Sequence, residues 1–151
     1  MSSILSSINS LSDEDQTLIF KAPAIVTVLI AGADQEIDKK EELQARKLVN
    51  YRTFTSDPFL QGYYEEVSEQ FGDNLEELMA AWSPETGVQA MSNSLREVGA
   101  AIKQLPEDHA GILKESLRSL AKKIAEADGG LFHMGGINAD ERHLMDLSEL
   151  G

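Results

Sequence analysis

The sequence predicts an all-α fold. All four prolines lie where a helix would begin, and a proline at the first helical position gives up only an N–H that has no intrahelical partner. Apolar residues recur at intervals of about four, as at Phe59, Tyr63, Val67 and Phe71, which is the spacing of one face of a helix. No Asn-Gly or Asp-Gly turn lies between two segments of alternating polarity, so β-hairpins are not expected.

We expect about seven helices, with one further short turn of helix near 74–81. They are expected at about 12–20, 23–34, 38–54, 58–72, 84–104, 107–127 and 138–149. Pro23 begins the second helix, while Asp57 and Ser83 are residue types that cap the helices expected to begin at Pro58 and Pro84. The segment 24–30 is rich in Ile and Val and would by itself suit a buried strand, but the proline before it and its context favour a buried helix.

Caps and apolar stripes support the remaining helices. Asp38 with Glu41, and Asn138 with Glu141, match a capping box at the starts of the third and the last helix. Acidic residues after Pro106 suit the positive end of a helix dipole. The stripes of the helices at 84–104 and 107–127 consist of Val88, Met91, Leu95, Val98 and Ile102, and of Leu113, Leu117, Leu120, Ile124 and Ala127.

Composition excludes several classes of function. The chain has 26 acidic and 13 basic residues and a formal net charge of −13, which argues against nucleic-acid binding and suits a protein that attracts cations or basic partners. It has no cysteine, so disulfides, thiolate metal sites and cysteine catalysis are excluded. Its longest apolar stretch, 22–33, is shorter than the ~20 residues of a membrane-spanning helix, and the N-terminus does not match a signal peptide. We therefore expect a cytoplasmic protein without direct membrane insertion.

Two segments near the two ends of the chain resemble each other. Ile30–Asp34 and Ile124–Asp128 share the pattern Ile-Ala-x-Ala-Asp. Each is followed by an isoleucine and then by one of the two predicted capping boxes. This pattern predicts a helix–turn–helix unit used twice. We expect a single domain over residues 1–151, with repeat halves at about 12–75 and 84–150.

The repeated alanine-Asp-Gly-x-hydrophobic-x-x-x-Glu pattern, in an acidic helical chain of this length, resembles the TerB-like tellurite-resistance family. Asp128-Gly129 matches the Asp-Gly of that family, whereas the first copy has Gln35 in place of the glycine and the second holds six extra residues within GGLFHMGG. The resemblance implies an array of helices in two pseudo-symmetric halves. It also implies a stress-response scaffold that acts beside a membrane-associated protein partner, with an acidic patch that binds metal ions and no established catalytic reaction.

The repeat also supplies a candidate metal site. Its carboxylates are Asp34, Asp38, Glu41, Asp128, Asp140 and Glu141. If the two halves pack face to face, these oxygen ligands suit Ca²⁺ or Mg²⁺. A Zn²⁺ site that also uses His133 and His143 is less favoured. The competing interpretation is purely structural, with these residues serving only as helix caps and turn residues.

Two functions remain open at this stage. The first is a non-enzymatic acidic helical module that binds a protein partner, with a divalent cation at the paired turns. The alternative is a carboxylate-based metal-dependent enzyme that uses the same acidic cluster, which requires a concave pocket with an open coordination position. The sequence leaves the oligomeric state open.

The remaining aromatic, histidine and charged side chains are expected to have structural roles in the core or on the surface. Tyr63, Tyr64, Phe71 and Trp82 are expected in the core. His109 is expected on the surface, in the first turn after Pro106. The solvated helix faces are expected to carry Glu65, Glu66, Glu69, Lys39, Lys40, Lys122 and Lys123.

Overall fold

The computed structural model describes residues 3–31, 39–83, 85–128, 147 and 150, and this part of the chain is helical without any strand. Its helices are α1 (Ile4–Ile8), α2 (Asp13–Ala31), α3 (Lys39–Thr55), α4 (Pro58–Ala80), α5 (Gly87–Ile102) and α6 (Glu107–Asp128). The all-α prediction is therefore confirmed for the described residues. The helix predicted at 138–149 lies outside them except for residue 147.

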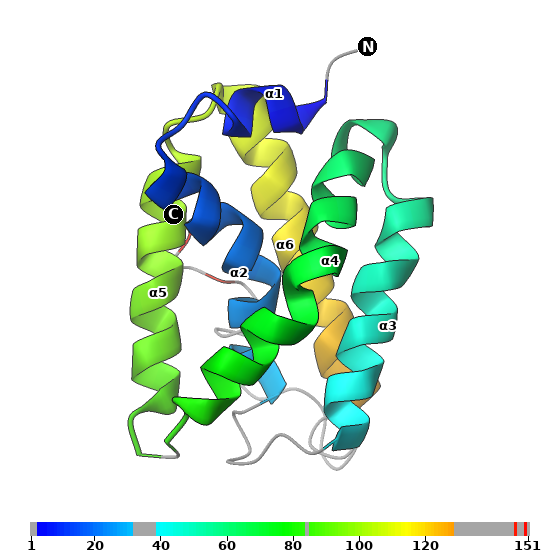
Figure 1. The fold of residues 1–151 in the computed structure, drawn as a ribbon, viewed down its shortest axis with the longest axis vertical. Helices are drawn as coiled ribbons and strands as arrows, with labels where there is room; N and C mark the ends of the chain where they lie inside the picture. Colours follow the sequence, from blue (N-terminus) through cyan, green and yellow to red (C-terminus); the bar gives the residue numbers. More distant parts are fainter. Residues whose placement is uncertain (1–2, 32–38, 84, 129–146, 148–149, 151) are drawn as a thin grey trace.

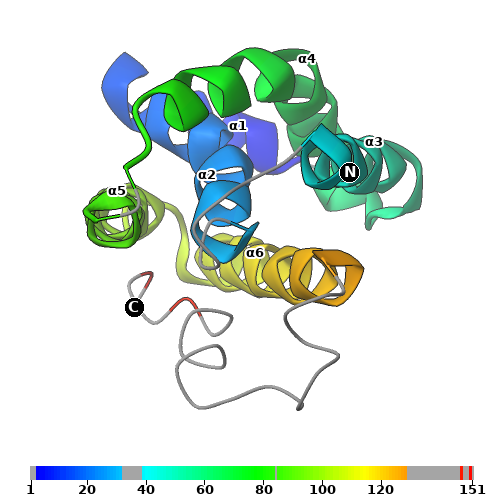
Figure 2. The same cartoon turned by 90° about the horizontal axis from the view of Figure 1, so that it is seen from below.

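Helix α2 is the centre of the molecule. It packs against α4, α5 and α6, and Figures 1 and 2 show these three helices arranged around it. Helix α3 packs against α4 and α6 on the side of α2 opposite α5. The short helix α1 packs against α4.

The central position of α2 follows from its composition. Residues 22–31 are all buried, and ten consecutive residues of a helix cover its whole circumference. A helix that is apolar on every side is stabilised only where neighbours surround it. The prediction of a buried helix rather than a strand at 24–30 is thus confirmed.

The predicted helix start at Pro23 is wrong, because α2 begins at Asp13 and continues through the proline. An interior proline leaves the carbonyl four residues earlier without its N–H donor and commonly costs about 3 kcal/mol. That carbonyl belongs to Ile19, and the buried Tyr63 hydroxyl of α4 donates a hydrogen bond to it at 2.8 Å. A side chain distant in sequence therefore replaces the missing backbone donor, while burial of the surrounding apolar residues offsets the remaining cost.

Three other boundaries differ from the prediction. Helix α1 was not expected, and Ser3 caps it by accepting a hydrogen bond from the N–H of Leu5 at 3.2 Å. The segments at 58–72 and 74–81 form one helix, α4, because its apolar stripe continues through Leu75. Helix α5 begins at Gly87 rather than at 84, after a turn in which the Ser83 carbonyl accepts from the Gly87 N–H.

The N-terminus of α4 is capped as predicted. The carboxylate of Asp57 accepts a hydrogen bond from the N–H of Phe59 at 2.9 Å, and Pro58 is the first helical residue. The arrangement in two pseudo-symmetric halves and the seventh helix stay predictions, since 129–146 lie outside the described residues.

The aromatic core is as expected except at its edge. Tyr63, Tyr64 and Phe71 are buried, whereas Trp82 is only partly buried and packs against the core. The predicted solvated lysines and glutamates of α3, α4 and α6 are exposed. The surface assignment of His109 is wrong. Its ring is half-buried, because its Nδ1 lies 2.6 Å from the Ser7 hydroxyl of α1 and its ring meets Phe59 edge-on.

Two adjacent buried tyrosines should make the free energy of unfolding depend on pH in the alkaline range. Burial raises the pKa of Tyr63 well above the ordinary 10.0, and the neighbouring Tyr64 raises it further. Burial also raises the pKa of Tyr64, although hydrogen bonding by Ser116 and the charge of Arg52 act in the opposite direction. The unfolded chain therefore loses these protons first, so the free energy of unfolding should fall as the pH rises above about 10.

Thermal unfolding at a series of alkaline pH values measures this effect. The Tm of the wild type should fall steadily with pH, and it should fall less steeply in a Tyr63→Phe variant, which has lost one of the two groups. Equal slopes in both proteins would contradict this assignment.

Candidate functional site

The structure does not test the predicted cation site, because most of its residues lie outside the described part of the chain. These are Asp34, Asp38, His133, Asp140, Glu141 and His143. Of the others, Glu41 is in the first turn of α3 and Asp128 is the last residue of α6. Figure 1 shows that the start of α3 and the end of α6 lie at the same end of the molecule. Among the described residues, no three His, Asp or Glu side chains form a group that could hold a metal ion.

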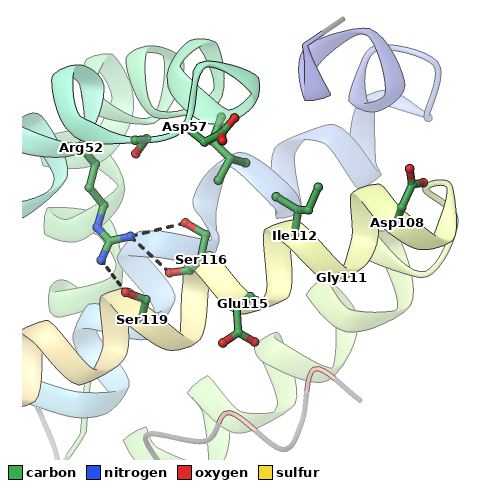
Figure 3. Close-up of a pocket in the computed structure, with 10 residues that line it drawn as sticks. Arg52, Asp57, Asp108, Gly111, Ile112, Glu115, Ser116 and Ser119 are labelled. Carbon is green, nitrogen blue, oxygen red and sulfur yellow. Dashed lines mark hydrogen bonds between the residues drawn. The ribbon is translucent and has the colours of Figure 1, made fainter.

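The described residues instead show a groove between α3 and α6. One hollow of about 640 Å³ is lined by residues of α3, α6 and the start of α4. A second hollow of about 420 Å³ continues it past Tyr51 toward Lys123, and both share Arg52 and Ser56. We call this continuous depression the α3–α6 groove, and Figure 3 shows the wider hollow.

Small side chains on α6 create the groove. The core-facing stripe of α6 carries large apolar residues such as Leu113, Leu117 and Leu120. Gly111, Ser116 and Ser119 of α6 line the wider hollow, and Ser116 and Ser119 are hydrogen-bonded to Arg52 of α3. A Cβ atom built on Gly111 would meet nothing within 4 Å. Because these residues are small, they leave open space between α3 and α6 next to the line along which the two helices touch.

Arg52 lines both hollows of the groove and links the two helices. One guanidinium nitrogen lies 3.4 Å from both the carbonyl and the hydroxyl oxygen of Ser116, and the other lies 3.1 Å from the hydroxyl of Ser119 (Figure 3). The guanidinium carbon also lies 5.7 Å from the centre of the Tyr64 ring. No described carboxylate forms an ion pair with Arg52. The positive charge of Arg52 is therefore stabilised by two hydroxyl groups, one carbonyl group and an aromatic ring.

The hydroxyl of Ser116 is hydrogen-bonded to Tyr64 and Arg52. An activated serine needs a neighbouring base, usually a histidine or a carboxylate, and no described residue of either kind is hydrogen-bonded to this hydroxyl. Burial raises the pKa of the neighbouring Tyr64 phenol above its ordinary value.

Apolar side chains are exposed beside the groove. Tyr51 and Phe54 of α3 are 65% and 74% exposed, and Ile112 of α6 is 43% exposed. Tyr51 lines the narrower hollow of the groove, whereas Phe54 lines a separate depression between α3 and α4. We call the pair Tyr51 and Phe54 the α3 ridge. Large aromatic residues exposed side by side are typical of surfaces that bind other proteins.

The α3 ridge was not predicted from the sequence. The buried residues of α3 include Ala45 and Val49, and the half-buried Arg52 continues their spacing along one face. Tyr51 and Phe54 fall outside that face. Their positions outside the buried stripe indicate that both aromatic residues are exposed. This can be recognised only when the buried face of the helix is known.

Carboxylates lie beside Phe54 and Ile112, whereas the hollow beside Tyr51 is lined by the cations Arg52 and Lys123. Glu65 and Glu69 line the depression beside Phe54. Asp57 and Asp108 lie at the end of the groove that contains Ile112, and Figure 3 shows Glu115 pointing away from α3 at its outer edge. Negative charge therefore borders Phe54 and Ile112, while Tyr51 lies in a hollow with two cations, of which Lys123 is 3.8 Å from the carboxylate of Glu126.

Comparisons with known proteins found no matching family model, curated protein or solved structure. No described helix has the length and apolar character needed to span a bilayer.

Proposed function

We propose that this chain is an acidic helical module that binds a protein partner through the α3 ridge and is not an enzyme. The observation that carries the proposal is the exposure of Tyr51 and Phe54 next to each other on one helix. Tyrosine and phenylalanine are enriched at the centres of interfaces, because each buries a large area with few rotatable bonds. Covering both rings removes apolar surface from water and favours association.

The charge of the surface indicates the kind of partner. Glu65 and Glu69 lie beside Phe54, and the whole chain carries a net charge of −13. Like charges facing one another across an interface oppose association, whereas complementary charge accelerates it. A basic partner is therefore favoured over a second copy of this chain.

Site-specific photo-crosslinking tests the proposal. A photoreactive phenylalanine analogue at Phe54 should capture a defined partner in the cells that make the protein. The same analogue at Ala100, an exposed position of α5 on the opposite side of the molecule, is the matched control. The crosslinked partner should be basic, and its binding to the purified chain should weaken when Tyr51 is replaced by serine. Identical products from both positions, or binding unaffected by Tyr51→Ser, would refute the proposal.

We also propose the role implied by the resemblance to the TerB-like family, a stress-response scaffold with a divalent cation at the paired turns. The positions of Glu41 and Asp128 support this, since the helices that carry them reach the same end of the molecule. The cation would lie at a different place from the α3 ridge. The two proposals can therefore be tested separately.

A thermal-unfolding scan of EDTA-treated protein with and without added Ca²⁺, Mg²⁺, Zn²⁺ or Mn²⁺ tests the cation site. An ion that binds only the folded state at a hundredfold excess over its Kd stabilises it by about 2.7 kcal/mol, so the Tm should rise with one of these ions. The rise should disappear in an Asp34→Ala, Asp128→Ala double variant. A Tm unchanged by every ion would refute the cation site and leave the partner proposal intact.

A further inference from the structure

We propose that the α3–α6 groove binds one amphipathic helix of a basic partner. This inference rests on the proposed function and names the structural element that the partner contributes. The proposed binding surface begins at Tyr51 of the α3 ridge and extends to the hollow around Ile112.

The length of the groove suits a helix. Along α6 the groove extends from Asp108 to Lys123. At about 1.5 Å per residue this distance is on the order of 22 Å, which is roughly four helical turns. The small residues Gly111, Ser116 and Ser119 along this face allow the backbone of a docked helix to approach α6 closely.

The apolar contacts lie at intervals along this length. Ile112 stands at the wider hollow and Tyr51 at the narrower one, and both are exposed in the isolated chain. A helix with apolar residues about every fourth position can contact both with one face. Each contact would remove exposed apolar surface from water without rearranging the core.

The charges of the wider hollow favour a basic helix. Asp57, Asp108 and Glu115 line this hollow, while its one cation, Arg52, is already engaged by Ser116 and Ser119. At the other end of the groove, Lys123 lies 3.8 Å from the carboxylate of Glu126. Lysine or arginine side chains that flank the apolar face of the partner can reach the carboxylates of Asp57 and Asp108. A second copy of this acidic chain and an anionic membrane surface would both be repelled.

Selection from a displayed peptide library tests this inference. The library holds peptides of about 15 residues with apolar residues fixed at helical spacing and all other positions random. The full chain is the target, and excess Gly111→Trp protein in solution removes peptides that bind elsewhere. Gly111 suits this purpose because it lines the wider hollow and its Cβ position opens into empty space, so a tryptophan side chain here should obstruct the groove. Thermal unfolding confirms that the variant is folded.

Enriched peptides should carry lysine or arginine beside the apolar face and become helical when bound. Their Kd should rise at least about tenfold in Gly111→Trp and severalfold in Asp108→Asn. It should not change in Ala100→Trp, a matched small-to-aromatic change at an exposed position of α5. Enrichment of acidic peptides, or binding insensitive to Gly111→Trp, would overturn the inference.

Two further results identify other occupants and also overturn it. A concentration-dependent dimer of the wild type that Gly111→Trp abolishes would assign the groove to a second copy. A partner that crosslinks at Phe54 equally well in the Gly111→Trp background would place the contact on the α3 ridge alone. In that second case the proposed function stands while the groove inference fails.

Discussion

Replacing Gly87 with alanine should lower the free energy of unfolding by about 1–3 kcal/mol. Gly87 is the first residue of α5 and is buried. A Cβ atom at this position would overlap Cε3 of the Trp82 ring, because it would lie closer than non-bonded carbon atoms can approach. The indole must therefore move out of its place against the core. Because Trp82 is the sole tryptophan of the chain, its fluorescence emission should shift together with the loss of stability.

Gly111→Ala is the matched control for this substitution. Gly111 is an interior residue of α6 whose Cβ position is empty. Alanine here should raise the free energy of unfolding by about 0.5–1 kcal/mol, because it restricts the unfolded chain and favours the helix. Denaturant unfolding of both variants measures the two effects. If both substitutions changed the free energy of unfolding in the same direction, the packing of Trp82 against Gly87 would not be the cause of the effect of Gly87→Ala.

Replacing Tyr63 with phenylalanine should lower the free energy of unfolding by about 1–3 kcal/mol. The Tyr63 hydroxyl donates to the carbonyl of Ile19, whose usual partner would be the N–H that Pro23 lacks. Without the hydroxyl, a buried carbonyl in the centre of α2 is left without a donor. The aromatic ring itself keeps its place, so little packing is lost.

Pro23→Ala separates this explanation from a general effect of the hydroxyl. Alanine restores an N–H that can donate to the Ile19 carbonyl. The cost of Tyr63→Phe should then be smaller in the Pro23→Ala background than in the wild type, by at least about 0.5 kcal/mol. Urea unfolding of the four proteins of this double-mutant cycle gives the coupling. Additive effects would show that Tyr63 does not compensate for the proline.

Interactions between residues close in sequence were predicted well. The apolar stripe that begins at Phe59 and the cap formed by Asp57 are both found, because each depends on residues within one or two turns. Helix start signals failed at Pro23 and at Ser83. In the first case a distant side chain compensates for the proline, and in the second the chain forms a turn before α5 begins.

The candidate surface depended on information that local patterns do not carry. Tyr51 and Phe54 are ordinary members of a helical segment until the packing of α3 shows which of its faces is buried. The groove is lined by Arg52 together with its hydrogen-bond partners Ser116 and Ser119, which lie 64 and 67 residues away. No spacing rule connects these residues.

The sequence by itself determined the helical class, the identity of α2 as a buried helix and the acidic character of the surface. The first two properties follow from the periodicity of apolar residues within a few helical turns, and the third follows from the composition of the whole chain. Only the tertiary structure decided that α2 passes through Pro23, that His109 meets Ser7 and that the α3 ridge is exposed beside a groove. Each of these depends on a partner brought close by the packing of helices, and helix packing is set by the fit of whole surfaces rather than by neighbours in sequence.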